Sequence, residues 1–82
     1  MASQDTYDRL TVVFRDVFDD DAVVATAVLS AEDVEEWDSL ANVRLFLALE
    51  QSFGVRFSSA EMTGLANVGE LAGLLEKKRA SR

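Results

Sequence analysis

Apolar residues recur at helical spacing near the start of the chain. From about Thr6 to Phe18 they return every three or four positions, with charged residues on the other side. This period is typical of an amphipathic helix. We expect Asp5 or Thr6 to cap its start, because their side-chain oxygens can accept a backbone N–H bond. The acidic run at 19–21 predicts its end, since negative charge opposes the helix dipole there.

The clearest helical pattern extends from Asp38 to Phe53. Asp38 is a good N-cap residue, and Gly54 stands at the position after a helix where a left-handed conformation is common. Apolar residues dominate the segment between them. The pattern therefore predicts a second helix with defined ends.

Two further helices follow, each marked by a capping pattern. Ser58, with Glu61 three positions later, forms a capping box that opens a short helix, which we expect Gly64 to close. Asn67 and Glu70 repeat this spacing ahead of the stripe of a last helix. Its final turn is basic, which complements the helix dipole.

The segment between the first two helices, residues 19–38, has no sustained period. Its embedded apolar residues favour a loop pinned to the core, with room for a single turn at 30–36. No segment alternates as a convincing strand, although 55–57 is a short extended candidate. The prediction is one all-α domain over residues 1–82: a small bundle of three main helices plus one short helix, with a long loop between the first and second helices. Residues 1–4 and 78–82 are expected to be flexible tails.

The composition excludes several kinds of chemistry. The 82 residues include neither Cys nor His, so disulfides, thiolate zinc sites and Ser-His or Cys-His nucleophile pairs are ruled out. We expect no metal site and no self-sufficient hydrolase. The net charge of −7 argues against nucleic acids and anionic membranes as partners, since both need a basic surface. There is no apolar run near the roughly 18 residues of a membrane span and no sign of a signal peptide, so we expect a cytoplasmic protein.

The second helix carries two apolar stripes on opposite sides, at 100° per residue. They consist of Leu45, Phe46, Leu49 and Phe53 on one side, and of Leu40, Val43 and Leu47 on the other. One explanation is a helix in the centre of the bundle, covered on both sides. The other is that the second stripe is exposed and docks a partner. Its polar rim is then Arg44, Glu50 and Gln51.

Ser39 occupies the first helical position, directly after the expected cap. Backbone amides and the helix dipole favour negative charge there, so a phosphate ester on its hydroxyl is electrostatically favourable. Asp38 beside it is suited to help hold a divalent metal during phosphoryl transfer. A serine at this position is, however, most often only part of a helix start.

The segment Glu36-Trp37-Asp38-Ser39-Leu40 and the helix that follows it resemble the acyl and peptidyl carrier protein family. The spacing of Leu40, Val43, Leu45, Leu49 and Glu50 is similar to that of a carrier's second helix. Residues 53–57 resemble the exit of that helix, 58–65 the short third helix and 67–75 the fourth. The resemblance covers nearly the whole chain and is strongest over 30–75.

The resemblance implies that Ser39 receives 4′-phosphopantetheine from coenzyme A through a separate, magnesium-dependent phosphopantetheinyl transferase. The arm ends in a thiol that carries an acyl, aminoacyl or peptidyl group as a thioester, so the reactive sulfur comes with the prosthetic group. The chain is then a carrier and not an enzyme. The implied partner-docking residues are Leu40, Val43, Arg44, Leu47, Glu50 and Met62, with Met62 also close to the arm. The implied acyl pocket lies between the second and third helices, near Leu49, Phe57 and Leu65.

Two departures from housekeeping fatty-acid carriers narrow this expectation. Those carriers usually have Gly where this chain has Glu36, and their second helix is strongly acidic. Here that helix contains Arg44, Gln51 and a single acid, Glu50. We expect a free-standing, monomeric carrier dedicated to a specialised fatty-acid, polyketide or nonribosomal-peptide-type pathway. Its partners are expected to be acyl- or aminoacyl-activating ligases, synthases or transferases.

Two alternatives remain at this stage. Trp37 either pins the loop against the core, which we favour because large aromatic residues beside a helix start are usually packed, or contacts a partner. The chain itself is alternatively a small acidic helical adaptor that binds a partner through Leu40, Val43 and Leu47 and has no prosthetic group.

Overall fold

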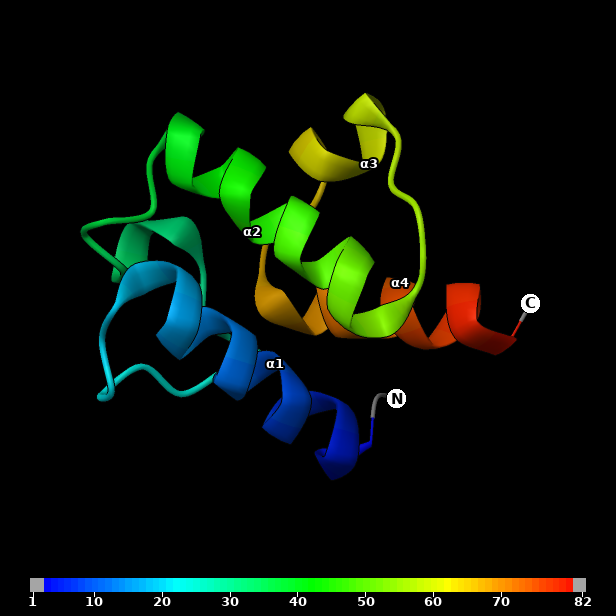
Figure 1. Cartoon of the computed structure of the whole chain (residues 1–82), viewed down its shortest axis with the longest axis horizontal. Helices are drawn as coiled ribbons and strands as arrows, with labels where there is room; N and C mark the ends of the chain where they lie inside the picture. Colours follow the sequence, from blue (N-terminus) through cyan, green and yellow to red (C-terminus); the bar gives the residue numbers. More distant parts are fainter. Residues whose placement is uncertain (1–2, 81–82) are drawn as a thin grey trace.

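Helices α1 (Gln4–Phe18), α2 (Ser39–Phe53) and α4 (Val68–Ala80) surround a shared core, and the short α3 (Ser59–Thr63) lies beside α2 (Figure 1). The structure is a computed structural model that describes residues 3–80. A single 3₁₀ turn, η1 (Ala31–Asp33), interrupts the long loop between α1 and α2. Over the described range there is no strand, and the predicted all-α fold with three main helices and one short helix is confirmed.

The core is built from one apolar face of each main helix. The residues that are fully buried include Leu10 and Phe14 of α1, Leu45 and Leu49 of α2, and Val68 and Leu75 of α4. Full burial of a side chain of this size stabilises the fold by about 1.5–3 kcal/mol. The first of the two stripes predicted on α2 therefore faces the core.

The start of α1 differs from the prediction. The helix begins at Gln4, two residues earlier than expected, and the Ser3 hydroxyl is the cap that accepts the Thr6 N–H. Thr6 is buried, and its hydroxyl donates to Glu76 of α4 at 2.6 Å. The Ser3 N–H donates to the same carboxylate at 2.7 Å. These bonds fix the first turn, so the expectation of a cap at Asp5 or Thr6 was wrong.

The expectation of flexible tails at 1–4 and 78–82 stays a prediction, although helices reach into both ranges in the described chain. Ser3 and Gln4 belong to the start of α1, and α4 continues through Ala80. The Lys78 ammonium pairs with Glu61 of α3 at 2.9 Å, which ties the last turns of α4 to the bundle. The expectations for 1–2 and 81–82 lie outside the described residues.

The end of α1 agrees with the prediction, because Asp19 follows it in a left-handed conformation with φ 50°. The loop beyond it is attached to the bundle by backbone hydrogen bonds. The Val68 N–H donates to the carbonyl oxygen of Leu29 at 2.8 Å, and the Gly69 N–H donates to that of Ala27 at 3.0 Å. These bonds satisfy donors at the start of α4 that have no partner within the helix. A Cβ at Gly69 would lie 2.8 Å from the Ala27 carbonyl oxygen, so this contact requires glycine.

Candidate functional site

Ser39 is the first residue of α2 and its side chain is exposed. Its hydroxyl makes no hydrogen bond to any described residue. Asp38 caps the helix as predicted: its Oδ1 accepts the Ala41 N–H at 2.8 Å. The second carboxylate oxygen of Asp38 is not used by the cap. The structure thus presents an accessible hydroxyl and an accessible carboxylate oxygen on neighbouring residues at the positive end of a 15-residue helix.

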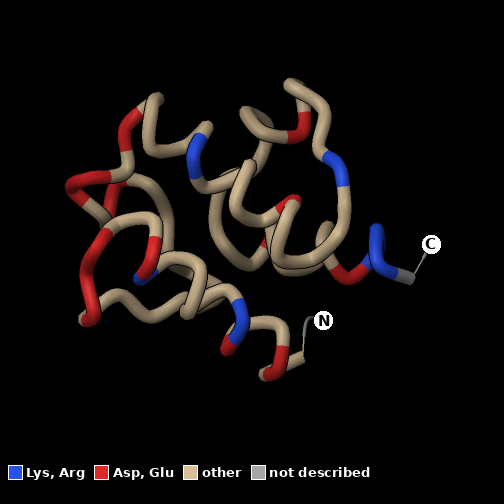
Figure 2. The backbone as a smooth tube through the Cα atoms, in the orientation of Figure 1, with Lys and Arg blue, Asp and Glu red and all other residues tan. Residues whose placement is uncertain are grey.

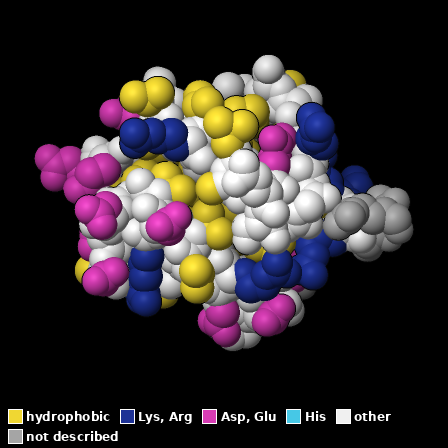
Figure 3. Space-filling view, viewed as in Figure 1, with side chains coloured by type: hydrophobic (Ala, Val, Ile, Leu, Met, Phe, Trp, Pro, Cys, Tyr) yellow, Lys and Arg dark blue, Asp and Glu magenta, His cyan; other side chains and the backbone are white. Residues whose placement is uncertain are grey.

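The second apolar stripe of α2 is exposed. Leu40, Val43 and Leu47 retain 66%, 45% and 55% of their surface, and we call these three residues the outer stripe. Apolar side chains gather over α2 and toward α3 in the space-filling view (Figure 3). The central-helix explanation is therefore wrong for this side of α2, because no element among residues 3–80 buries these side chains.

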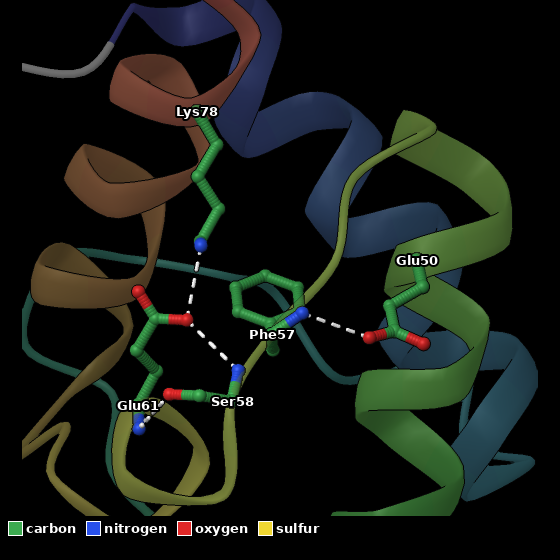
Figure 4. A network of polar contacts seen from close by, with 5 residues as sticks. All are labelled: Glu50, Phe57, Ser58, Glu61 and Lys78. Carbon is green, nitrogen blue, oxygen red and sulfur yellow. Dashed lines mark hydrogen bonds and ion pairs between the residues drawn. The ribbon is translucent and has the colours of Figure 1, made fainter. Parts of the chain in front are cut away.

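The charges around the outer stripe are unevenly distributed (Figure 2). Acidic residues gather in the loop between α1 and α2, whereas α2 itself carries the exposed Arg44. Glu50, the single acid of α2, is only half-exposed, and its Oε2 accepts the Phe57 N–H at 2.8 Å (Figure 4). Glu50 thus anchors the segment between α2 and α3, and the charge that α2 offers to a partner is positive.

A polar network holds α3, which has no buried residue, against its neighbours (Figure 4). The predicted capping box is present: the Ser58 hydroxyl accepts the Glu61 N–H, and the Glu61 carboxylate accepts the Ser58 N–H. The same carboxylate binds Lys78. The Ser58 N–H and the Lys78 ammonium lower the pKa of Glu61. The network fixes α3 at a defined distance from α4.

A cleft of about 430 Å³ opens beside Ser39. The α1–α2 loop, α2, α3 and the segment leading into α4 line it, and its lining includes Trp37, Ser39, Asn42, Phe46, Met62 and Leu65. We call it the Trp37 cleft. The structure therefore brings together Ser39, Met62 and Leu65, three of the residues singled out from the sequence.

The other two residues of the expected acyl pocket are not part of this cleft. Leu49 is fully buried in the core, because it belongs to the inner face of α2. The Phe57 ring packs edge-on against Phe46, with ring centres 4.9 Å apart. Leu65 lines this cleft, whereas Leu49 and Phe57 do not, and the expected acyl pocket among these three residues stays a prediction.

Sequence reasoning did not place Trp37 or Asn42 in a cleft beside Ser39, although both line it. The Trp37 ring packs edge-on against Phe14 at 5.5 Å, and its Nε1–H donates to Asn42 Oδ1 at 3.0 Å. The favoured prediction for Trp37, packing against the core, is confirmed. One signal was available for Asn42: at 100° per residue it lies within the arc of the buried stripe, where a polar side chain requires a hydrogen-bond partner or a cleft.

The described part of the chain was searched for metal-binding groups and for membrane-spanning helices. Over residues 3–80, no group of three or more acidic side chains is arranged to hold a metal ion. In the same part of the chain, each helix is too short or too polar to cross a membrane.

Comparison with known proteins identifies the family. No protein-family model matches the chain, and no curated protein does. Among solved structures, the chain is similar to the solution NMR structure of a holo acyl carrier protein from Geobacter metallireducens. The two share 46% sequence identity with a TM-score of 0.88, over 93% of this chain and 87% of the other. With this identity and coverage, and with a serine and an exposed apolar stripe at the start of α2, the chain belongs to the acyl carrier protein family.

Proposed function

We propose that this acyl carrier protein carries acyl groups as thioesters on a 4′-phosphopantetheine arm attached to Ser39. The observation that carries the proposal is the Ser39 hydroxyl, which is exposed, makes no hydrogen bond to a described residue and lies at the rim of the Trp37 cleft. The similar structure is that of a holo acyl carrier protein. The residues present fit the group, because the positive end of α2 favours the phosphodiester charge.

Attachment is a phosphoryl transfer from coenzyme A to the serine. Ser39 Oγ forms a bond to the β-phosphorus of coenzyme A, and the pyrophosphate bond breaks. Adenosine 3′,5′-bisphosphate leaves, and the hydroxyl proton passes to a base of the phosphopantetheinyl transferase. Mg²⁺ is needed only during this step, and the second carboxylate oxygen of Asp38 is available to help hold it. Once attached, the arm supplies the thiol that the chain lacks, since the sequence has no Cys.

The outer stripe, together with Met62 in the lining of the Trp37 cleft, is proposed as the surface that partner enzymes bind. Exposed apolar patches of this kind are typical of interaction sites. Arg44 beside the stripe and the hydrogen-bonded Glu50 favour partners other than those that recognise an acidic helix. We therefore propose ligases, synthases or transferases of a specialised fatty-acid, polyketide or nonribosomal-peptide-type pathway.

The test is uptake of the arm. The protein is incubated with coenzyme A, Mg²⁺ and a broad-specificity phosphopantetheinyl transferase, and its intact mass is measured. We expect one phosphopantetheine on the wild type and none on Ser39→Ala. Ser59→Ala is the matched control, because Ser59 is also an exposed serine at the first position of a helix. It should be modified like the wild type.

Two results would overturn the proposal: no uptake by the wild type, or equal uptake by Ser39→Ala. Absence of uptake would instead support the adaptor hypothesis. An adaptor needs the outer stripe but not the serine. Partner binding would then survive Ser39→Ala and be lost in Leu47→Asp.

A further inference from the structure

Arg44 lies at one edge of the outer stripe. It comes four positions after Leu40 and three before Leu47, and residues at these spacings are neighbours on a helix surface. At 100° per residue, Arg44 is rotated by about 40° from Leu40 and by about 60° from Leu47. It is exposed, and among residues 3–80 no hydrogen bond or ion pair holds its guanidinium. The structure thus places an uncompensated positive charge directly beside the exposed apolar residues.

No acidic side chain on α2 neutralises Arg44. Glu50 is the single acid of the helix, and its carboxylate accepts the Phe57 N–H at 2.8 Å. Glu61 of the neighbouring α3 is paired with Lys78. An acid three or four positions away could form an ion pair with Arg44 on the helix surface, but all of these positions are apolar: Leu40, Ala41, Leu47 and Ala48. The charge of Arg44 is therefore available to a partner.

The face around the outer stripe carries charges of both signs in a fixed order. Glu35, Glu36 and Asp38 are exposed and precede Ser39, whereas Arg44 follows it by five positions, or about 7.5 Å along the helix axis. Figure 2 shows this separation, with acidic residues on the loop that leads into α2 and a basic residue on α2 itself. A partner with complementary charges is attracted in one orientation along α2 and repelled in the reversed one.

Binding through the outer stripe would remove water from the Arg44 guanidinium. A charge that loses its hydration and gains no partner is unfavourable. A carboxylate on the partner restores the lost interactions, because a guanidinium can donate two parallel hydrogen bonds to it. A Lys or Arg at the same place would bring like charges together and oppose binding. Arg44 therefore favours an acidic group on the partner and selects against a basic one.

We propose that this face fits a partner enzyme whose apolar groove carries a carboxylate opposite Arg44, and that Arg44 excludes enzymes that recognise an acidic α2. The inference rests on the proposed function, because it concerns the enzymes that act on the arm at Ser39. It adds the chemistry of their contact surface and names the residue that selects for it.

The test compares two forms of one enzyme. The probe is a phosphopantetheinyl transferase of housekeeping fatty-acid carriers, chosen for a basic docking surface. In its second form, the basic residue that faces the second helix of its own carrier is replaced by Glu. We measure kcat/KM at low salt for the wild-type carrier and for Arg44→Glu. The parental enzyme should modify Arg44→Glu several-fold faster than the wild type, and the Glu-bearing form should reverse this preference. The differences should lie in KM, because Arg44 is proposed to act in binding.

Arg56→Glu is the matched control. It makes the same change of charge at an exposed position beyond the C-terminal end of α2, and it should show no reversal between the two enzyme forms. Raising the salt concentration from about 50 mM to about 500 mM should bring both preferences for or against Arg44→Glu toward one, since salt screens exposed charges. A purely structural effect of the substitution would follow neither the charge of the enzyme nor the salt concentration.

Failure of this inference differs from failure of the proposed function. If a broad-specificity transferase adds no arm to the wild type, the proposed function fails and the inference fails with it. If that arm is added, but the parental basic enzyme modifies Arg44→Glu no better than the wild type, only the inference is overturned. It is also overturned if the Glu-bearing enzyme keeps the preference of its parent. Equal effects of Arg44→Glu and Arg56→Glu would indicate a response to total charge and would overturn it as well.

Discussion

Asp38 has two roles that substitution can separate. Its Oδ1 caps α2 through the Ala41 N–H at 2.8 Å, and its carboxylate charge is proposed to assist Mg²⁺ during modification of Ser39. Asn caps a helix about as well as Asp, whereas Ala does not cap and costs about 1 kcal/mol. We therefore expect Asp38→Asn to keep the stability of the wild type within a few tenths of a kcal/mol.

The two variants are compared by thermal unfolding, followed by circular dichroism, and by the rate of phosphopantetheinylation. For a domain of this size, a loss of 1 kcal/mol lowers Tm by about 4–8 °C, which is the expected effect of Asp38→Ala. Both variants lack the charge, and we expect both to be modified at least about tenfold more slowly, the loss typical of a group that supports a metal site. Asp21→Asn is the control, because it removes the same charge from an exposed loop position.

Either of two outcomes would refute this reasoning. If Asp38→Asn lowers Tm as much as Asp38→Ala, the cap does not account for the stability. If Asp38→Asn is modified at the rate of the wild type, the carboxylate charge has no role in the transfer to Ser39.

Two other predictions concern the two faces of α2 and the dependence of the free energy of unfolding on pH under acid conditions. Leu49→Ala should lower the free energy of unfolding, measured in urea, by about 2–5 kcal/mol. Leu47→Asp, an exposed substitution, should change it by less than about 0.5 kcal/mol and yet slow the phosphopantetheinylation of Ser39. Equal losses of stability in the two variants would contradict the assignment of the two faces. The hydroxyl of Thr6, and then the N–H of Ser3, lower the pKa of Glu76 below its ordinary value of 4.5. This interaction therefore stabilises the fold fully above about pH 4.5 and is lost as the pH falls through the lowered pKa. Glu76→Gln should flatten that dependence in urea unfolding repeated from about pH 7 down to about pH 3, and an unchanged slope would show that the interaction does not contribute.

Most of the fold was predictable because its helices carry local signals. The period of apolar residues, the caps at Asp38 and Ser58, and Gly54 after α2 act over a few positions, and each has the predicted role. The start of α1 was predicted wrongly because, of the residues there that can cap a helix, Ser3 is the one supported by a contact distant in sequence. Ser3 and Thr6 are held by Glu76, which lies 73 and 70 positions away in the sequence.

The candidate site was predictable in part. Ser39 and the outer stripe follow from helical geometry, although the exposure of the stripe could be decided only by knowing what packs beside α2. The grouping of Leu49 and Phe57 with Leu65 came from family resemblance. In this chain the loop before α2 places Trp37 where it forms a cleft closer to Ser39. The sequence pattern predicts that this loop packs on the core, but it does not predict where the loop lies relative to α3.

The contact between Ser3 and Glu76 also has a practical consequence. It places the start of α1 beside the last turns of α4, and Figure 1 shows both ends on the side of the bundle away from the start of α2. A linker, an affinity tag or a surface tether joined at either end would thus leave Ser39 and the outer stripe unobstructed. The protein is therefore suited to immobilisation, with its carrier face directed outward toward enzymes in solution.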